Sequence, residues 1–167
     1  MKLTEELKIA VKELLAANEH SRVGGSVALI LKGFDLRRPS GDIDIIVNSL
    51  NLKLPKNFVI LSEDEKGGRA SDPTNTCVMH LPTGHIFDIL EAKTWNENFI
   101  EVSGFRLDDV SDIVKSKVEY VLKPHLSDKI RAKHISDLLL ILPNITEQIL
   151  LRESRKTTVD EDWDLPF

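Results

Sequence analysis

Two aspartates, Asp42 and Asp44, open an apolar segment that ends at Val47. Successive side chains of a β-strand point to opposite faces, so both carboxylates are expected on one face while Ile43 and Ile45 enter a core. Two carboxylates about 5 Å apart repel each other by roughly 3 kcal/mol at an effective dielectric constant of about 20. Mg²⁺, a divalent cation that prefers oxygen ligands, removes this repulsion. The spacing of the two aspartates therefore predicts a metal site.

A glycine pair followed by a serine, Gly24-Gly25-Ser26, precedes a short apolar segment that ends near Lys32. Glycines lack a Cβ atom, which lets backbone N–H groups approach a phosphate, and the start of a helix carries partial positive charge. Ser26 either caps this helix or donates its hydroxyl to a phosphate oxygen. Together with the carboxylate pair, this turn indicates phosphoryl or nucleotidyl transfer.

The connection between these two motifs carries Lys32, Arg37, Arg38 and Ser40. Arg38 and Ser40 stand just before the aspartates, a position that suits contact with triphosphate oxygens. Arg37 and Lys32 are weaker candidates for the same role. The alternative is that these cations belong to an ordinary solvated surface.

A third aspartate, Asp88, interrupts the otherwise apolar segment 85–90. This segment and the segment 76–81 flank Pro82-Thr83-Gly84, and the pattern predicts a β-hairpin. An ionised carboxylate inside an apolar strand is costly unless it has a partner. Asp88 is therefore the third candidate metal ligand, and the alternative is a strand-edge aspartate that faces water.

The pattern Gly-Gly-Ser, then Arg-x-Ser-x-Asp-x-Asp, resembles the nucleotidyltransferase superfamily that includes DNA polymerase β. It is most similar to the small bacterial enzymes related to abortive-infection (AbiE-type) toxins and antitoxins, whose third carboxylate Asp88 matches. The resemblance implies that Asp42, Asp44 and Asp88 hold two Mg²⁺ ions, with Mn²⁺ as an alternative. It also implies that Asp88 accepts a proton from the acceptor and that Gly24-Gly25-Ser26 binds the β- and γ-phosphates.

The C-terminal part extends the resemblance. Lys117, followed by Arg131-x-Lys133-His134-x-x-Asp137-Leu138, is similar to the helical signature of the same enzymes. The resemblance implies that Lys117 and Asp137 contact the nucleotide, although either His134 or Asp137 could fill the family's acidic position. By its chemistry alone, a lysine on an apolar stripe can also extend its charged end into water and have no further role.

The motifs together predict an enzyme that moves a nucleoside monophosphate from a nucleoside triphosphate to an acceptor hydroxyl and releases pyrophosphate. The resemblance leaves transfer RNA, a protein and a small molecule open as acceptors. A catalytically weak nucleotide-binding or protein-interaction module of the same fold is the alternative, but such a module has no need of three mutually repulsive aspartates.

Composition limits the class of protein. The 167 residues carry a formal net charge of −5, so general binding to a nucleic-acid backbone is not indicated. One cysteine, Cys77, excludes an internal disulfide and a cysteine-rich zinc site, which suits a reducing cytoplasm, and Cys77 is expected to be a buried small apolar residue. No signal peptide and no apolar run of membrane-spanning length is visible.

The expected fold class is α/β (α+β): a mixed sheet of the nucleotidyltransferase fold with flanking helices and a short C-terminal helical segment. The apolar patterns predict helices at 4–18, 25–32, 110–122, 127–142 and 144–154, and strands at 42–47, 58–61, 76–81, 85–90 and 99–102. Residues 1–107 are expected to form the core and 108–154 helices packed on it. Residues 155–167 are expected to be a flexible acidic tail in which Trp163 could contact a protein partner.

Overall fold

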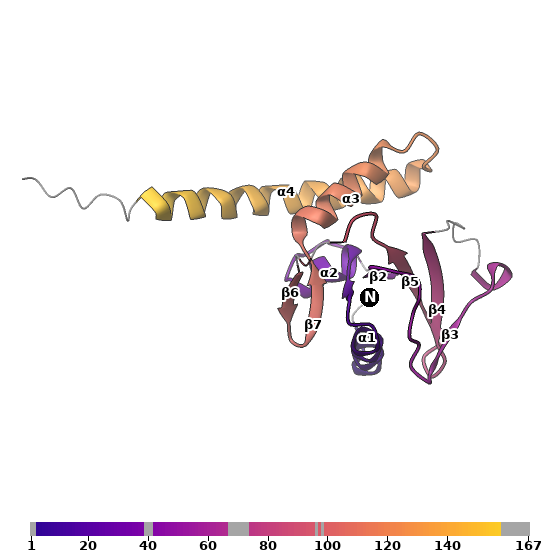
Figure 1. Ribbon diagram of the computed structural model, residues 1–167. Coiled ribbons are helices and arrows are strands. Elements are labelled where there is room, and N and C mark those ends of the chain that lie inside the picture. Colours follow the sequence, from indigo (N-terminus) through magenta and orange to yellow (C-terminus); the bar gives the residue numbers. More distant parts are fainter. Residues whose placement is uncertain (1–2, 39–41, 67–73, 96, 98, 158–167) are drawn as a thin grey trace, which may run out of the picture. The chain divides into compact units, whose positions relative to one another are not determined.

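The computed structural model of the chain describes residues 3–38, 42–66, 74–95, 97 and 99–157 (Figure 1). The chain divides into two compact units, residues 1–113 and 114–167. Among the described residues, no helix combines the length and the apolar content needed to cross a membrane. Arg69 and the acidic end of the chain with Trp163 lie outside the described residues.

The described part of the first unit contains a seven-stranded sheet in the order β3-β4-β5-β2-β1-β7-β6. The strands are β1 (Ser21–Val23), β2 (Ile43–Val47), β3 (Phe58–Ile60), β4 (Asn75–His80), β5 (His85–Glu91), β6 (Phe99–Val102) and β7 (Phe105–Asp108). The pairs β2–β5 and β1–β7 are parallel, and the other neighbouring pairs are antiparallel. The chain therefore has a mixed sheet with flanking helices, as the sequence predicts.

Strand β2 alternates as expected. Ile43, Ile45 and Val47 are at most 2% exposed, whereas Asp44 and Ile46 are half-buried. Because alternate side chains of a strand point to opposite faces, the apolar residues enter the core and Asp44 lies on the other face.

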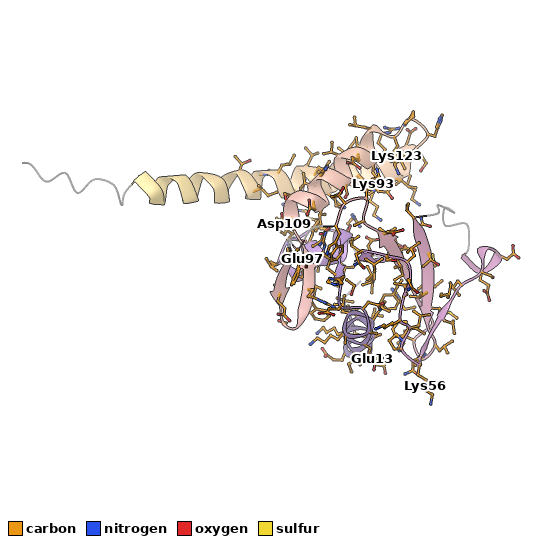
Figure 2. All side chains as sticks on the ribbon, viewed as in Figure 1. Glu13, Lys56, Lys93, Glu97, Asp109 and Lys123 are labelled. Atoms are coloured by element: carbon orange, nitrogen blue, oxygen red, sulfur yellow. The ribbon has the colours of Figure 1, made fainter. Side chains whose placement is uncertain are left out.

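Two complete α-helices and a short 3₁₀ helix (Glu63–Lys66) lie in the described part of the first unit. Helix α1 (Glu5–Ala17) begins at Thr4, whose side chain accepts a hydrogen bond from the Leu7 amide, as its sequence predicts. Its apolar stripe is buried, while Glu13 lies on the side turned away from the sheet (Figure 2). Helix α2 (Gly25–Leu31) follows β1 directly and packs against β2 and β7.

The two hairpins differ in how well the sequence predicts them. The β4–β5 hairpin forms as expected, with His80 opposite His85. At 95–107 the sequence predicts one short strand, but β6 and β7 form a hairpin whose turn residues, Ser103 and Gly104, have φ values of 53° and 78°. Strand β1 lies between the predicted helices at 4–18 and 25–32, where no strand is predicted from the sequence. Strands β1 and β7, which the sequence does not predict, are both short. They pair with each other in parallel, so each is stabilised by a neighbour that is distant in the sequence.

Helix α3 (Val110–Leu122) begins in the first unit and continues into the second, and α4 (Asp128–Thr157) follows. Ser127 lies before α4 as the predicted cap, its hydroxyl 3.5 Å from the Ile130 amide. The prediction that Pro143 ends this helix and that a third helix starts at Asn144 is wrong, because α4 runs through Pro143. Proline removes one hydrogen bond and clashes with the preceding turn, but the residues on either side can remain helical. Here Thr146 Oγ1 also donates to the Leu142 carbonyl at 2.9 Å.

Candidate active site

The two central strands bring two of the predicted carboxylates together. Asp44 on β2 and Asp88 on β5 are directly paired in the parallel register. Neighbouring strands lie about 4.8 Å apart, and directly paired residues project from the same face. Both side chains are half-buried. The sequence predicts that these two aspartates share one site, and their register places them side by side.

Gly24 and Gly25 lie on the side of Asp44 that is opposite to Asp88. The Gly24 amide donates to the Asp44 carbonyl at 2.9 Å. Gly25 has a φ of +57°, and a Cβ built on it would lie 2.9 Å from Asp44 Cγ and overlap its Oδ2. The sequence interpretation explains the absent Cβ by the approach of a phosphate, but the Asp44 carboxylate takes that space. Gly25 therefore allows the carboxylate to lie against the start of α2.

Ser26 and Arg38, the predicted phosphate contacts, lie next to each other. Arg38 Nη2 donates to Ser26 Oγ at 2.9 Å, and Arg38 is half-buried. Gly24 occupies the N-cap position of α2, and no side chain makes a capping hydrogen bond there. The expectation that Ser26 caps the helix is therefore not met. The hydroxyl of Ser26 instead joins the first turn of α2 to the loop that leads to β2.

The remaining loop candidates are placed differently. Lys32 Nζ donates to the Asp108 carbonyl, so this amine contacts the end of β7. Arg37 is exposed and has a φ of +52°, and its amide donates to Asp35 Oδ1 at 2.9 Å. Ser40 lies outside the described residues.

Asp42 is half-buried and immediately precedes β2. Within the residues that the structure describes, no group of three or more histidine, cysteine, aspartate or glutamate side chains is arranged to hold a metal. Mg²⁺, however, is usually bound by one or two carboxylates together with substrate phosphates and water. The pair formed by Asp44 and Asp88 fits that mode of binding, in which the ion arrives with its substrate.

Strand β4 adds a residue to the candidate site, on the side of β5 that lies away from Asp44. Cys77 on β4 is directly opposite Asp88, and its thiol donates to Asp88 Oδ1 at 3.3 Å. The strand order β4-β5-β2-β1 makes Cys77, Asp88, Asp44 and Gly24 consecutive across the sheet. The candidate site therefore includes a thiol on the β4 side of the carboxylate pair.

A buried ion pair that the sequence does not predict lies on β1 and β7. Arg22 Nε is 2.6 Å from Asp108 Oδ1, with the two side chains 3% and 8% exposed. The Arg22 guanidinium lies 4.5 Å above the Trp95 ring, whose Nε1 donates to Glu97 at 2.8 Å (Figure 2 labels Glu97). Burial raises the pKa of Asp108 to about 6, although Arg22 acts in the opposite direction and the nearby Asp112 in the same one. Three-residue strands such as β1 leave too short a pattern to predict this pair.

In the second unit, Lys117 and Asp137 contact each other. Lys117 Nζ is 2.7 Å from Asp137 Oδ2, and both side chains are buried. His134 stacks on Tyr120, with ring centroids 5.1 Å apart. Asp137, and not His134, is therefore the acidic partner of Lys117.

Comparison with known proteins adds a structural likeness. No protein-family model and no curated protein matches the chain. Among solved structures, the chain is similar to "Crystal structure of JHP933 from Helicobacter pylori", with 18% sequence identity and a TM-score of 0.49. The match covers 80% of this chain and 62% of that one, so the chain spans less than two thirds of the JHP933 chain. The chemistry of the site therefore rests on its own residues.

Proposed function

We propose that the protein is a metal-dependent nucleotidyltransferase of the DNA polymerase β superfamily, related to the AbiE-type enzymes. The observation that carries this proposal is the direct pairing of Asp44 and Asp88 on parallel strands, next to the glycine that starts α2. Two carboxylates held side by side in a half-buried place repel each other, and a divalent cation relieves that repulsion. A purely structural role would not require this arrangement.

Asp44 and Asp88, with Asp42 at the start of β2, would hold Mg²⁺ or Mn²⁺. When bound, the cation neutralises the charge of the triphosphate and orients the acceptor oxygen. Arg38 and Ser26 bind and orient phosphate oxygens, since their hydrogen bond places a guanidinium and a hydroxyl at the first turn of α2. The carboxylate of Asp88 takes the proton of the attacking hydroxyl.

The resemblance implies nucleotide contacts for Lys117 and Asp137. Within the second unit, Asp137 fixes the position of the Lys117 ammonium group, with Nζ 2.7 Å from Oδ2. The acceptor is transfer RNA, a protein or a small molecule, and the reaction takes place in the cytoplasm.

The test is incubation of the purified protein with each α-³²P-labelled nucleoside triphosphate and Mg²⁺, in the presence of total RNA or a cell lysate. We expect the wild type to transfer the α-label and not a γ-label, and Asp44→Asn and Asp88→Asn to transfer neither. Glu13→Gln is the matched control, because it removes one carboxylate charge from the exposed side of α1 and should retain transfer.

Transfer by the two aspartate variants at the wild-type rate would refute the assignment of the site. Metal-dependent nucleotide binding without transfer to any acceptor would favour the alternative, a binding module of the same fold.

A further inference from the structure

Cys77 donates a hydrogen bond to one of the carboxylates of the proposed site. We propose that Cys77 is a positioning residue, whose thiol holds Oδ1 of Asp88 and thereby fixes the orientation of this carboxylate beside Asp44. This inference rests on the proposed function and adds a residue that acts through Asp88 without touching the nucleotide.

The position of Cys77 follows from the β4–β5 register. Cys77 pairs with Asp88, and Val78 pairs with Phe87 on the opposite, fully buried face. Cys77 is 5% exposed, so its thiol and the half-buried Asp88 meet where little water competes for the hydrogen bond.

The direction of the contact matters as much as its length. The strand order places β4 and β2 on opposite sides of β5. The thiol therefore holds Oδ1 of Asp88 from the β4 side, while Asp44 lies on the β2 side. The thiol hydrogen bond fixes the rotation of the Asp88 carboxylate about its Cβ–Cγ bond, with Oδ1 on the β4 side, so that the other oxygen stays available to a cation shared with Asp44.

Two other roles for Cys77 fit less well. A role as a metal ligand fits poorly, because Mg²⁺ and Mn²⁺ prefer oxygen ligands and thiolates suit softer metals. A packing role alone would need only a small apolar side chain, and valine would then replace Cys77 better than serine does. Positioning requires a donor, so it predicts the opposite order.

The experiment compares Cys77→Ser, which keeps a donor, with Cys77→Val, which keeps the volume and removes the donor. Mn²⁺ affinity is measured by electron paramagnetic resonance in the presence of a non-hydrolysable nucleoside triphosphate analogue. The Mg²⁺ concentration for half-maximal transfer, kcat and KM are measured separately. Loss of a residue that orients a metal ligand typically weakens metal affinity or activity about 10–100-fold. We expect a loss of this size for Cys77→Val, with KM for the acceptor unchanged, and a loss of at most about threefold for Cys77→Ser.

Val78→Ala is the matched control, because it removes buried volume from the neighbouring residue on the other face. It should lower the melting temperature without changing Mn²⁺ affinity. Equal Mn²⁺ affinities for the serine and valine variants, or a higher affinity for the valine variant, would overturn the inference.

Failure of the inference and failure of the proposed function give different results. If Cys77→Ser binds Mn²⁺ more tightly than Cys77→Val but no protein transfers nucleotide, the positioning role stands and the transferase function fails. If the wild type transfers nucleotide but the two variants behave alike, the function stands and the positioning role fails. A wild type that binds no Mn²⁺ even with a non-hydrolysable nucleoside triphosphate analogue present overturns both.

Discussion

Replacement of Gly25 by alanine should disable the site by displacing a carboxylate. The new Cβ would lie 2.9 Å from Asp44 Cγ and overlap Oδ2, whereas ordinary contacts begin at 3.4 Å. Asp44 Cγ must therefore move by at least 0.5 Å (3.4 − 2.9), and the overlapping oxygen by more. A misplacement of about 1 Å can cost on the order of 100-fold in rate, so we expect a loss of transfer of about that size or larger.

Alanine at this position also strains the backbone, because Gly25 has a φ of +57°. The left-handed conformation costs an L-residue about 1–2 kcal/mol. Gly84→Ala is the matched control, since Gly84 has a φ of +64° and no other group lies within 4 Å of the place that an alanine Cβ would occupy. Both variants should lose about 1–2 kcal/mol in the free energy of unfolding from strain. Only Gly25→Ala should also lose Mn²⁺ affinity and transfer.

Urea unfolding followed by circular dichroism gives the two free energies, and electron paramagnetic resonance gives the Mn²⁺ affinity of each variant. If Gly25→Ala binds Mn²⁺ and transfers nucleotide as Gly84→Ala does, then Gly25 does not position Asp44 and the reasoning is refuted.

Three further predictions concern charge. Asp44→Asn should raise the free energy of unfolding without metal by up to roughly 3 kcal/mol, because it removes repulsion with Asp88; a clear loss in urea unfolding would contradict this. Asp108 has a pKa of about 6 instead of 3.8, so the folded chain keeps a proton that the unfolded chain releases between about pH 4 and 6. Relative to Asp108→Asn, the wild type should therefore lose up to about 3 kcal/mol in its free energy of unfolding as pH rises from about 4 to 7. A difference between the two proteins that does not change with pH would argue against this prediction. Lys117→Met should lower the free energy of unfolding in urea by about 3–5 kcal/mol, because it leaves Asp137 buried without its partner. The double variant Lys117→Met/Asp137→Leu should recover most of that loss. Equal stability of the single and double variants would speak against a buried pair.

The predictable part of the fold is the part that local patterns determine. Alternation in 43–47 and the turn at 82–84 identify β2 and the β4–β5 hairpin, and apolar spacing identifies α1 and α3. Strands β1 and β7 are too short for such a pattern, and their mutual pairing joins segments far apart in the chain. Pro143 is a misleading stop signal, since proline prevents one hydrogen bond without preventing helix on both sides.

The candidate site divides in the same way. The alternation rule places Asp44 on the less buried face of β2, but only the parallel register of β2 and β5 shows that Asp88 is its neighbour. The reason for Gly25 could not be predicted, because it depends on a contact with a side chain on another strand. Cys77 could have been found: once His80 is paired with His85 across the hairpin turn, antiparallel counting puts Cys77 opposite Asp88.

The most direct test of the central claim is the position of a metal ion bound together with nucleotide. Crystals grown with Mn²⁺ and a non-hydrolysable nucleoside triphosphate analogue would locate the ion by its anomalous scattering. We predict Mn²⁺ about 2 Å from carboxylate oxygens of both Asp44 and Asp88, with phosphate oxygens completing its coordination. Mn²⁺ and nucleotide bound away from these two carboxylates, or no binding of either, would contradict the proposed active site.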